Sequence, residues 1–302
     1  MADDVCAADI TVNLDGLWLL QALSGITRLA PELRGRPYGQ PRSGQWLTQH
    51  PGLKVLVEQG VCDEGGVVRA DLAARLAVLA APDVEVILLV SSGPMRWSTP
   101  VALDEPATWR AIPAGQLRIV LARREGRWAS AVRAGQHITI DDCEGDDPQW
   151  LAQLVCDGLD SIHPVAPAQI STVNVALDDM HAAAAHCCGA GDIASRHAAL
   201  RAVGFGGAVL AELGPALDEP VAEAVLYARA HVDAATTWSE SVLDVRDTAS
   251  GRVVLYRLNP PHGSQQQWMA VGPATPAQLQ HAVTTVLASV AVRSWNAHER
   301  MP

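Results

Sequence analysis

The chain has 302 residues, enough for one large domain or two of ordinary size, and 49% of them are hydrophobic, enough to bury a sizeable core. Its formal net charge of −11 counts against a nucleic-acid-binding protein, because such proteins need a basic face to displace counterions from phosphates. Six cysteines in a chain of this length do not predict a disulfide framework.

The N-terminus, MADDVCAADI, has neither the basic nor the apolar region of a secretory signal peptide. The longest strongly apolar run, residues 84–90, is far shorter than the roughly 20 residues of a membrane-spanning helix. We therefore expect a cytoplasmic protein without a membrane span. Two stretches, 28–42 and 118–133, are locally rich in arginine. They are interpreted as solvated faces or as a docking surface for a protein partner, with nucleic-acid binding as a third alternative.

The first part of the chain predicts a strand followed by helices. Residues 10–14 alternate in polarity and are β-branched, which is typical of a strand. An apolar stripe then indicates a helix, with Asp15 as the expected N-cap. Residues 31–45 are rich in Pro, Gly and Arg and are predicted to form a loop. Helices are expected at 46–59 and 69–81.

The middle of the chain predicts an antiparallel meander. Residues 84–91 form a nearly continuous apolar run, typical of a buried strand. Residues 92–116 contain four prolines and form a long loop, and loops of that length are usually functional or disordered. Strands are expected at 117–124, 128–133 and 137–141, joined by short turns.

The remainder predicts more helices and a second set of strands. Asp147-Pro148 opens a helix with an N-cap followed by a proline. After a linker at 163–173, the pattern favours a run of helices and then a run of strands. The expected helices are 175–187, 192–203, 206–213 and 218–230, and the expected strands are 231–247, 252–258 and 266–272. A last helix is expected from Thr275-Pro276 to about residue 290.

An internal similarity suggests that the chain repeats itself. RIVLAR at 118–123 resembles RVVLYR at 252–257, and each half closes with a helix opened by an N-cap and a proline. We predict a duplicated α+β unit with halves at 1–163 and 164–302, in one compact domain. Chance similarity between short Val/Leu/Arg strands is the alternative.

The stretch HAAAAHCCGAG at 181–191 is the strongest candidate for chemistry. On a helix with about 100° per residue, His181 and Cys188 share a face, whereas His186 points roughly 140° away from His181. One helix therefore cannot direct the whole cluster at one metal, although a frayed end could gather two or three ligands. A metal-dependent hydrolase using His181, His186 and Cys188 stays as the alternative function. No nucleotide-binding loop, nucleophile elbow or HExxH motif is found, so we expect a protein that is not an enzyme and has no cofactor.

Several segments together resemble a known family. They are ITVNLDGLWLLQAL (10–23), APELRGRPY (30–38), WLTQHPG (46–52), VLAAPDVEV (78–86), RIVLARR (118–124), WASAVRAGQHITIDD (128–142), DGLDSIHP (157–164) and LYARAH (226–231). The chain resembles the EspG family, the ESX (type VII) secretion-associated chaperones of mycobacteria. It is most similar to the member that serves the fifth ESX system.

This resemblance implies a fold and a function. EspG proteins have a central antiparallel sheet flanked by two helical bundles, with pseudo-twofold symmetry. They bind PE–PPE heterodimers at the apolar tip of the PPE subunit, keep them soluble and direct them to secretion. We expect a chaperone of this kind that contacts no nucleic acid and is a monomer or homodimer when free.

Covering an apolar tip requires aromatic anchors within a polar rim. The loop at 92–116, the segment around 229–239 and the end of the first helix offer such side chains. The alternatives are core packing for each Trp and an idle surface charge for each Arg. The predicted partner-binding residues are Arg28, Trp97, Trp109, Arg110, Arg229, Asp233, Thr236 and Trp238.

Overall fold

A computed structural model describes residues 9–35, 47, 49–96, 112–189, 192–259 and 266–300. The predicted partner-binding residues Trp97, Trp109 and Arg110 lie outside the described residues, as do the side chains of residues 187–189.

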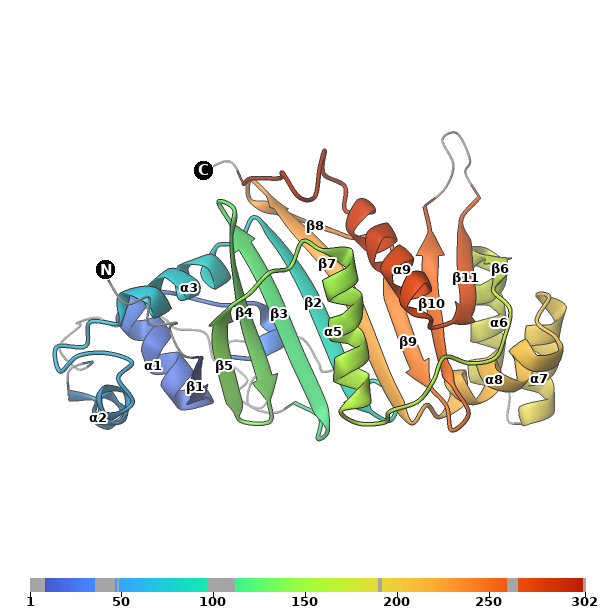
Figure 1. The fold of residues 1–302 in the computed structure, drawn as a ribbon, viewed down its shortest axis with the longest axis horizontal. Coiled ribbons are helices and arrows are strands. Elements are labelled where there is room, and N and C mark those ends of the chain that lie inside the picture. The colour runs from blue at the N-terminus through green and yellow to red at the C-terminus, as the bar shows by residue number, and fades with distance from the viewer. Residues whose placement is uncertain are drawn as a thin grey trace.

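Among the described residues, eleven strands form one antiparallel sheet (Figure 1). The strand order is β1-β5-β4-β3-β2-β7-β9-β10-β11-β6, and β8 pairs with β7 beside this path. The strands are β1 (Ile10–Asn13), β2 (Val84–Ser92), β3 (Gln116–Arg124), β4 (Arg127–Ala134), β5 (His137–Asp142), β6 (Val173–Ala176), β7 (Ala222–Val232), β8 (Ala235–Trp238), β9 (Leu243–Asp247), β10 (Arg252–Leu258) and β11 (Trp268–Pro273).

Helices cover both faces of this sheet. The helical elements are α1 (Leu14–Ser24), η1 (Pro31–Leu33), α2 (Pro51–Glu58), α3 (Ala70–Ala80), α5 (Pro148–Asp160), α6 (Leu177–Gly189), α7 (Ile193–Ala202), α8 (Gly207–Asp218) and α9 (Pro276–Ala288). Figure 1 shows α5 and α9 lying across one face of the central strands. Their apolar side chains pack on the alternate residues Val84, Val86, Leu88 and Val90 of β2.

The other face carries two separate helical groups. One group, with α1, α2 and α3, packs on β3, β4 and β5 around Val120 and Ile138. The second group, with α6, α7 and α8, packs on β10 and β11 around Val253 and Val271. The predicted α+β class, a central antiparallel sheet flanked by helical bundles, is confirmed.

Local capping chemistry sets where several helices begin. Asp147 caps α5 by accepting a hydrogen bond from the backbone N–H of Gln149 at 2.9 Å, and Thr275 caps α9 in the same way, both as predicted. The expected cap of α1 is wrong by two residues. The cap is Asn13, whose Oδ1 accepts from the N–H of Gly16 at 2.7 Å. Asp15 instead lies in the first turn, where the helix dipole favours its charge.

The predicted helix at 218–230 is wrong, because this segment is mostly β7, between β2 and β9. Its alanines favour a helix locally, but pairing on both sides overrides that preference. The predicted strand 231–247 is divided into β8 and β9. β6 spans the end of the predicted linker and the first residues of the helix predicted at 175–187, and η1 lies in the predicted loop at 31–45. The helix expected from 46 begins at Pro51, and α8 continues past Pro215 to Asp218.

The strand order repeats on either side of the β2–β7 pair, reading β2-β3-β4-β5-β1 in one direction and β7-β9-β10-β11-β6 in the other. This equates β4 with β10, so the sequence similarity that matched β3 with β10 is not the topological equivalence. The two edge strands, β1 and β6, also pass into their following helices in the same way. At the start of α1 the N–H of Leu14 donates to the carbonyl of Gln136 at 3.2 Å, and at the start of α6 the N–H of Leu177 donates to the carbonyl of Gln267 at 2.9 Å. Duplication itself and a boundary at 163 remain predictions.

Candidate functional site

Four of the predicted partner-binding residues, Arg28, Arg229, Thr236 and Trp238, line one pocket of about 270 Å³. Its walls come from the α1–η1 connection, the end of α3, and strands β2, β7 and β8. Because side chains alternate along a strand, Glu85 and Arg229 lie on the face of the sheet opposite α5 and α9. The other lining residues are Leu29, Ala30, Pro31, Leu79, Ala80, Pro82, Glu85 and His231.

Trp238 is the aromatic side chain of this pocket, and 52% of its surface is exposed. Its ring centroid lies 5.7 Å from that of Tyr227, and the guanidinium carbon of Arg229 lies 5.3 Å from the indole centroid. A tilted aromatic pair and a cation–π contact both hold the indole in place. A large aromatic ring that is fixed yet half exposed is typical of an anchor residue in a protein interface.

A buried charge network supports Trp238 from within. Arg229 is 3% exposed, and its two terminal nitrogens each donate to a Glu32 oxygen at 2.9 Å. The same guanidinium also donates to both oxygens of Glu85. Tyr227 donates its hydroxyl to Glu32 at 2.9 Å. Arg229 therefore acts inside the pocket wall, where it positions the indole.

The pKa values of this network follow from its contacts. Burial alone would raise the pKa of Glu85, but hydrogen bonds from His231 and Arg229 and the charge of Arg229 lower it below its usual range. Burial alone would lower the pKa of Arg229, whereas the two carboxylates raise it above its usual value. Both groups are thus ionised, as a paired and hydrogen-bonded network requires.

The rim of the pocket is polar. Arg28 and Thr236 are exposed. The hydroxyl of Thr236 lies 3.3 Å from Nδ1 of His231, whose Nε2 is 2.8 Å from Glu85. Among the described residues, Arg28 has no carboxylate within ion-pair distance. An aromatic anchor inside such a rim has the anatomy of a protein interface.

Asp233 lies just outside this pocket, in the turn between β7 and β8. It is exposed, has a left-handed φ of 51°, and lines a neighbouring depression of about 770 Å³. That depression also contains Arg124, Glu125, Glu299 and Arg300, so the end of the sheet next to the pocket is strongly charged.

Sequence reasoning missed a second set of residues beside the pocket. The C-terminal segment 290–300 contacts the β7–β8 hairpin through His298, whose Nε2 donates to the carbonyl of His231 at 2.7 Å. Arg123, 4% exposed, holds this segment by donating to the carbonyls of Trp295, Asn296 and His298. The sequence signals were Arg118 and Arg123 inside a mostly apolar strand, and Trp295 near the C-terminus.

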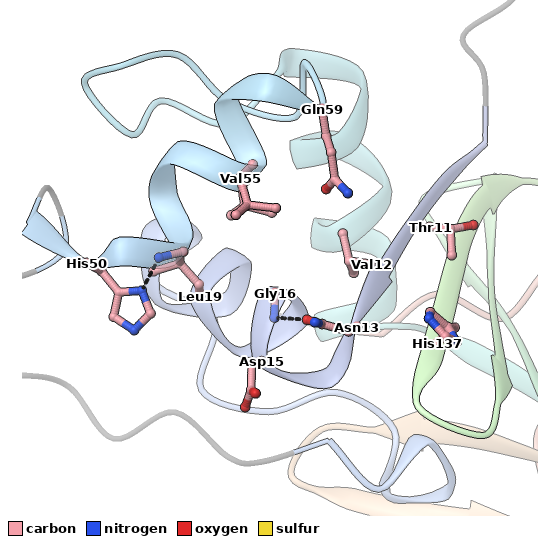
Figure 2. A pocket seen from close by; sticks show the side chains of 12 residues that line it. Thr11, Val12, Asn13, Asp15, Gly16, Leu19, His50, Val55, Gln59 and His137 are labelled. Carbon is pink, nitrogen blue, oxygen red and sulfur yellow. Dashed lines mark hydrogen bonds between the residues drawn. The ribbon is translucent and has the colours of Figure 1, made fainter.

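Another pocket, of about 260 Å³, lies at the outer edge of the sheet between α2 and β1 (Figure 2). His50 and Asn13 line it, but the side chains of both are engaged locally. Nδ1 of His50 accepts from the N–H of Gly52 at 3.1 Å, and Asn13 caps α1. None of the predicted partner-binding residues lines this pocket, so it is the weaker candidate.

The candidate metal cluster does not assemble from the residues that can be placed. His181 and His186 are exposed on α6, and the side chain of Cys188 is outside the described residues. Within the described part of the chain, no group of three or more His, Cys, Asp or Glu side chains could hold a metal ion. In the same part, every helix is too short or too polar to cross a membrane.

Comparison with known proteins gives consistent matches along the chain. The model of the EspG family matches residues 13–285. The ESX-5 secretion-associated protein EspG5 of Mycobacterium marinum is 44% identical over 293 residues, which are 97% of each chain. The EspG5 of Mycobacterium tuberculosis is 43% identical over the same share.

A solved structure agrees with these sequence matches. It is that of the Mycobacterium tuberculosis type VII secretion system chaperone EspG5 in complex with the PE25–PPE41 dimer. The TM-score is 0.85 at 42% identity, and the match covers 97% of this chain and all of that one. The resemblance inferred from the sequence segments is confirmed.

Proposed function

This chain belongs to the EspG family, and from that premise we propose that it is a cytoplasmic chaperone for PE–PPE heterodimers in type VII secretion. It binds the apolar tip of the PPE subunit, keeps the heterodimer soluble and directs it to the fifth ESX system. The observation that supports this proposal most strongly is the likeness, at a TM-score of 0.85, to an EspG5 chaperone solved with a PE–PPE dimer.

The physical basis is the need to cover an exposed apolar surface. A long helical protein with an apolar tip is prone to aggregate unless another protein buries that tip. The pocket around Trp238 fits this task, because it combines a fixed aromatic ring with apolar walls and a polar rim. Arg28, Thr236 and Asp233 are suited to hydrogen bonds and ion pairs around the covered area. Arg229 contributes by holding the ring.

The protein acts by binding and not by catalysis. The related proteins are named as secretion-associated proteins, and one of them as a chaperone. The alternative function, a metal-dependent hydrolase, requires one zinc ion per chain near His181, His186 and Cys188. Metal analysis of the purified protein separates the two functions, and stoichiometric zinc together with loss of activity on chelation would favour the hydrolase.

Co-expression with PE–PPE pairs tests the proposal. The panel contains the PE25–PPE41 dimer and pairs encoded in the genome that encodes this chain, each captured through a tag on this chain and sized by light scattering. We expect a discrete 1:1:1 complex with one or a few pairs. Failure to retain any pair, with the chaperone folded, would contradict the proposed function.

A further inference from the structure

The β7–β8 hairpin, which carries Asp233, Thr236 and Trp238, extends beyond the sheet. β2 pairs with β7 only as far as Val84↔Ala230, and β9 pairs with the opposite end of β7. From His231 onward, β7 pairs with β8 alone, and β8 is the returning arm of the same hairpin. The hairpin tip therefore lacks the neighbouring strands that fix the rest of β7.

The strand register shows where the tip could be held. The N–H of Ser239 donates to the carbonyl of Ala228 at 2.8 Å, which makes Trp238↔Arg229 a non-hydrogen-bonded pair of an antiparallel ladder. By alternation His231↔Thr236 is also such a pair, so the N–H and C=O of His231 point away from β8. The N–H donates to the carbonyl of Asp83 at 2.9 Å, and the C=O accepts from Nε2 of His298 at 2.7 Å.

The C-terminal segment thus takes the place of a missing strand. A second bond reaches the turn itself, where Nε of Arg300 donates to the carbonyl of Asp233 at 3.1 Å. Figure 1 shows this segment, in dark red, running from α9 toward the upper end of β7 and β8.

The same segment is anchored firmly to the body of the protein. Trp295 is buried in the core beneath α9. Nη2 of Arg123 donates to the carbonyls of Trp295 and His298 at 3.3 and 2.5 Å. Asp83 accepts the N–H of Arg300 at 3.0 Å through one oxygen and that of Glu125 at 2.7 Å through the other. The position of the tail is therefore fixed independently of the hairpin that it contacts.

We propose that His298 and Arg300 are positioning residues for partner binding, holding the β7–β8 hairpin in the geometry that presents Asp233, Thr236 and Trp238. This inference rests on the proposed function and adds to it a C-terminal segment that was not among the predicted partner-binding residues. Removing the contact leaves the bond from the His231 N–H to the carbonyl of Asp83 to hold the outer part of the hairpin to the sheet. Part of the binding free energy must then be spent on ordering the hairpin.

The test compares three variants of the full chain. His298→Ala removes the donor to the carbonyl of His231, whereas His298→Gln keeps a side-chain N–H donor of similar length. Arg293→Ala is the matched control, because Arg293 is exposed in the same segment. Two quantities are measured: the affinity for a PE–PPE dimer that the wild type binds, and amide hydrogen exchange of residues 231–239 without the dimer. Urea denaturation checks global stability.

We expect His298→Ala to weaken binding about fivefold to tenfold, because binding must then compensate for the loss of one intramolecular hydrogen bond that orders the hairpin. Exchange in residues 231–239 rises by a similar factor, while the urea midpoint falls no further than the loss of one hydrogen bond requires and the protein stays folded. His298→Gln restores both quantities, and Arg293→Ala changes neither. Unchanged affinity of His298→Ala would overturn the inference, as would a loss of affinity that Gln does not restore. If the wild type itself binds no dimer, the failure lies with the proposed function and the inference falls with it.

Discussion

Glu85 and Glu223 occupy corresponding positions on the two central strands, β2 and β7, yet their environments differ. Each lies equally far from the central Leu88↔Leu226 pair along its own strand, and each is almost fully buried on the same face of the sheet. Glu85 is surrounded by Arg229 and His231, and its pKa is lowered. Burial raises the pKa of Glu223, which shares its cation, Arg246, with Asp244.

This difference separates the end of the sheet proposed to bind the partner from the opposite end. At the Glu85 end Arg229 binds Glu85 and Glu32 through several hydrogen bonds, and these contacts hold its guanidinium next to the exposed indole of Trp238. At the Glu223 end two carboxylates compete for one arginine, and the network joins β7 and β9 to the backbone of Met95 and Ala216. The same topology therefore places an exposed aromatic side chain on a buried charge network at one end only, which is the end proposed to bind the partner.

The largest expected effect comes from removing Arg229, the cation that Glu32 and Glu85 share. Arg229→Ala leaves Glu32 and Glu85 buried without their common partner, and breaking a buried pair in this way costs about 3–5 kcal/mol of the free energy of unfolding. Urea denaturation at pH 7 measures it. Lys54→Ala, which removes an exposed ion pair to Glu58, is the control and should cost less than about 0.5 kcal/mol. Equal costs for the two variants would contradict the structural role of Arg229.

The two glutamates can be compared directly by replacing each with glutamine. Glu85→Gln should lower the free energy of unfolding at pH 7 by about 1–3 kcal/mol, because the ionised carboxylate is the favoured form there. Glu223→Gln should change it by less than about 1 kcal/mol or raise it, since the ionised form is disfavoured by burial. An equal loss in both variants would show that the two ends do not differ.

The two glutamates contribute to the pH dependence of the free energy of unfolding with opposite signs. The pKa of Glu85 is lowered by folding, so its stabilisation is present above the unfolded-state pKa, near 4.5, and is lost as the pH falls through the lower folded value. The pKa of Glu223 is raised, so its ionisation costs stability as the pH rises from about 4.5 through the folded value. Unfolding measured from pH 3 to 7 should show a flatter acid limb for Glu85→Gln and a steeper one for Glu223→Gln.

Much of the fold could be predicted from local patterns. The continuous apolar run identified β2, and Asp147-Pro148 and Thr275-Pro276 identified α5 and α9. β7 was missed because its alanines favour a helix, and only its pairing with β2 and β9 makes it a strand. The partners of Arg229 could not be predicted from the sequence. Glu85 lies opposite Arg229 because of the register of β2 with β7, and Glu32 reaches Arg229 from η1. The contacts of the C-terminal segment likewise join residues that are far apart in the sequence.

The smallest expected effects concern the helices that close each half. Asp147→Ala and Thr275→Ala each remove one capping hydrogen bond, at the start of α5 and of α9. Each should lower the free energy of unfolding by about 1 kcal/mol, measured by urea denaturation. Similar costs would support the equivalence of the two halves at this position. A cost more than twice as large for one cap would limit the equivalence to strand order.

Binding of a PE–PPE dimer at the surface around Trp238 is best tested by titrating such a dimer into wild-type protein, Trp238→Ala and Trp268→Ala. Trp268 is the matched control, an exposed tryptophan on β11 in the opposite part of the sheet. We expect a 1:1:1 complex for the wild type, at least tenfold weaker binding for Trp238→Ala, and unchanged binding for Trp268→Ala. Wild-type affinity in a folded Trp238→Ala protein would contradict the placement of the binding surface, and no complex with the wild type would contradict the chaperone function.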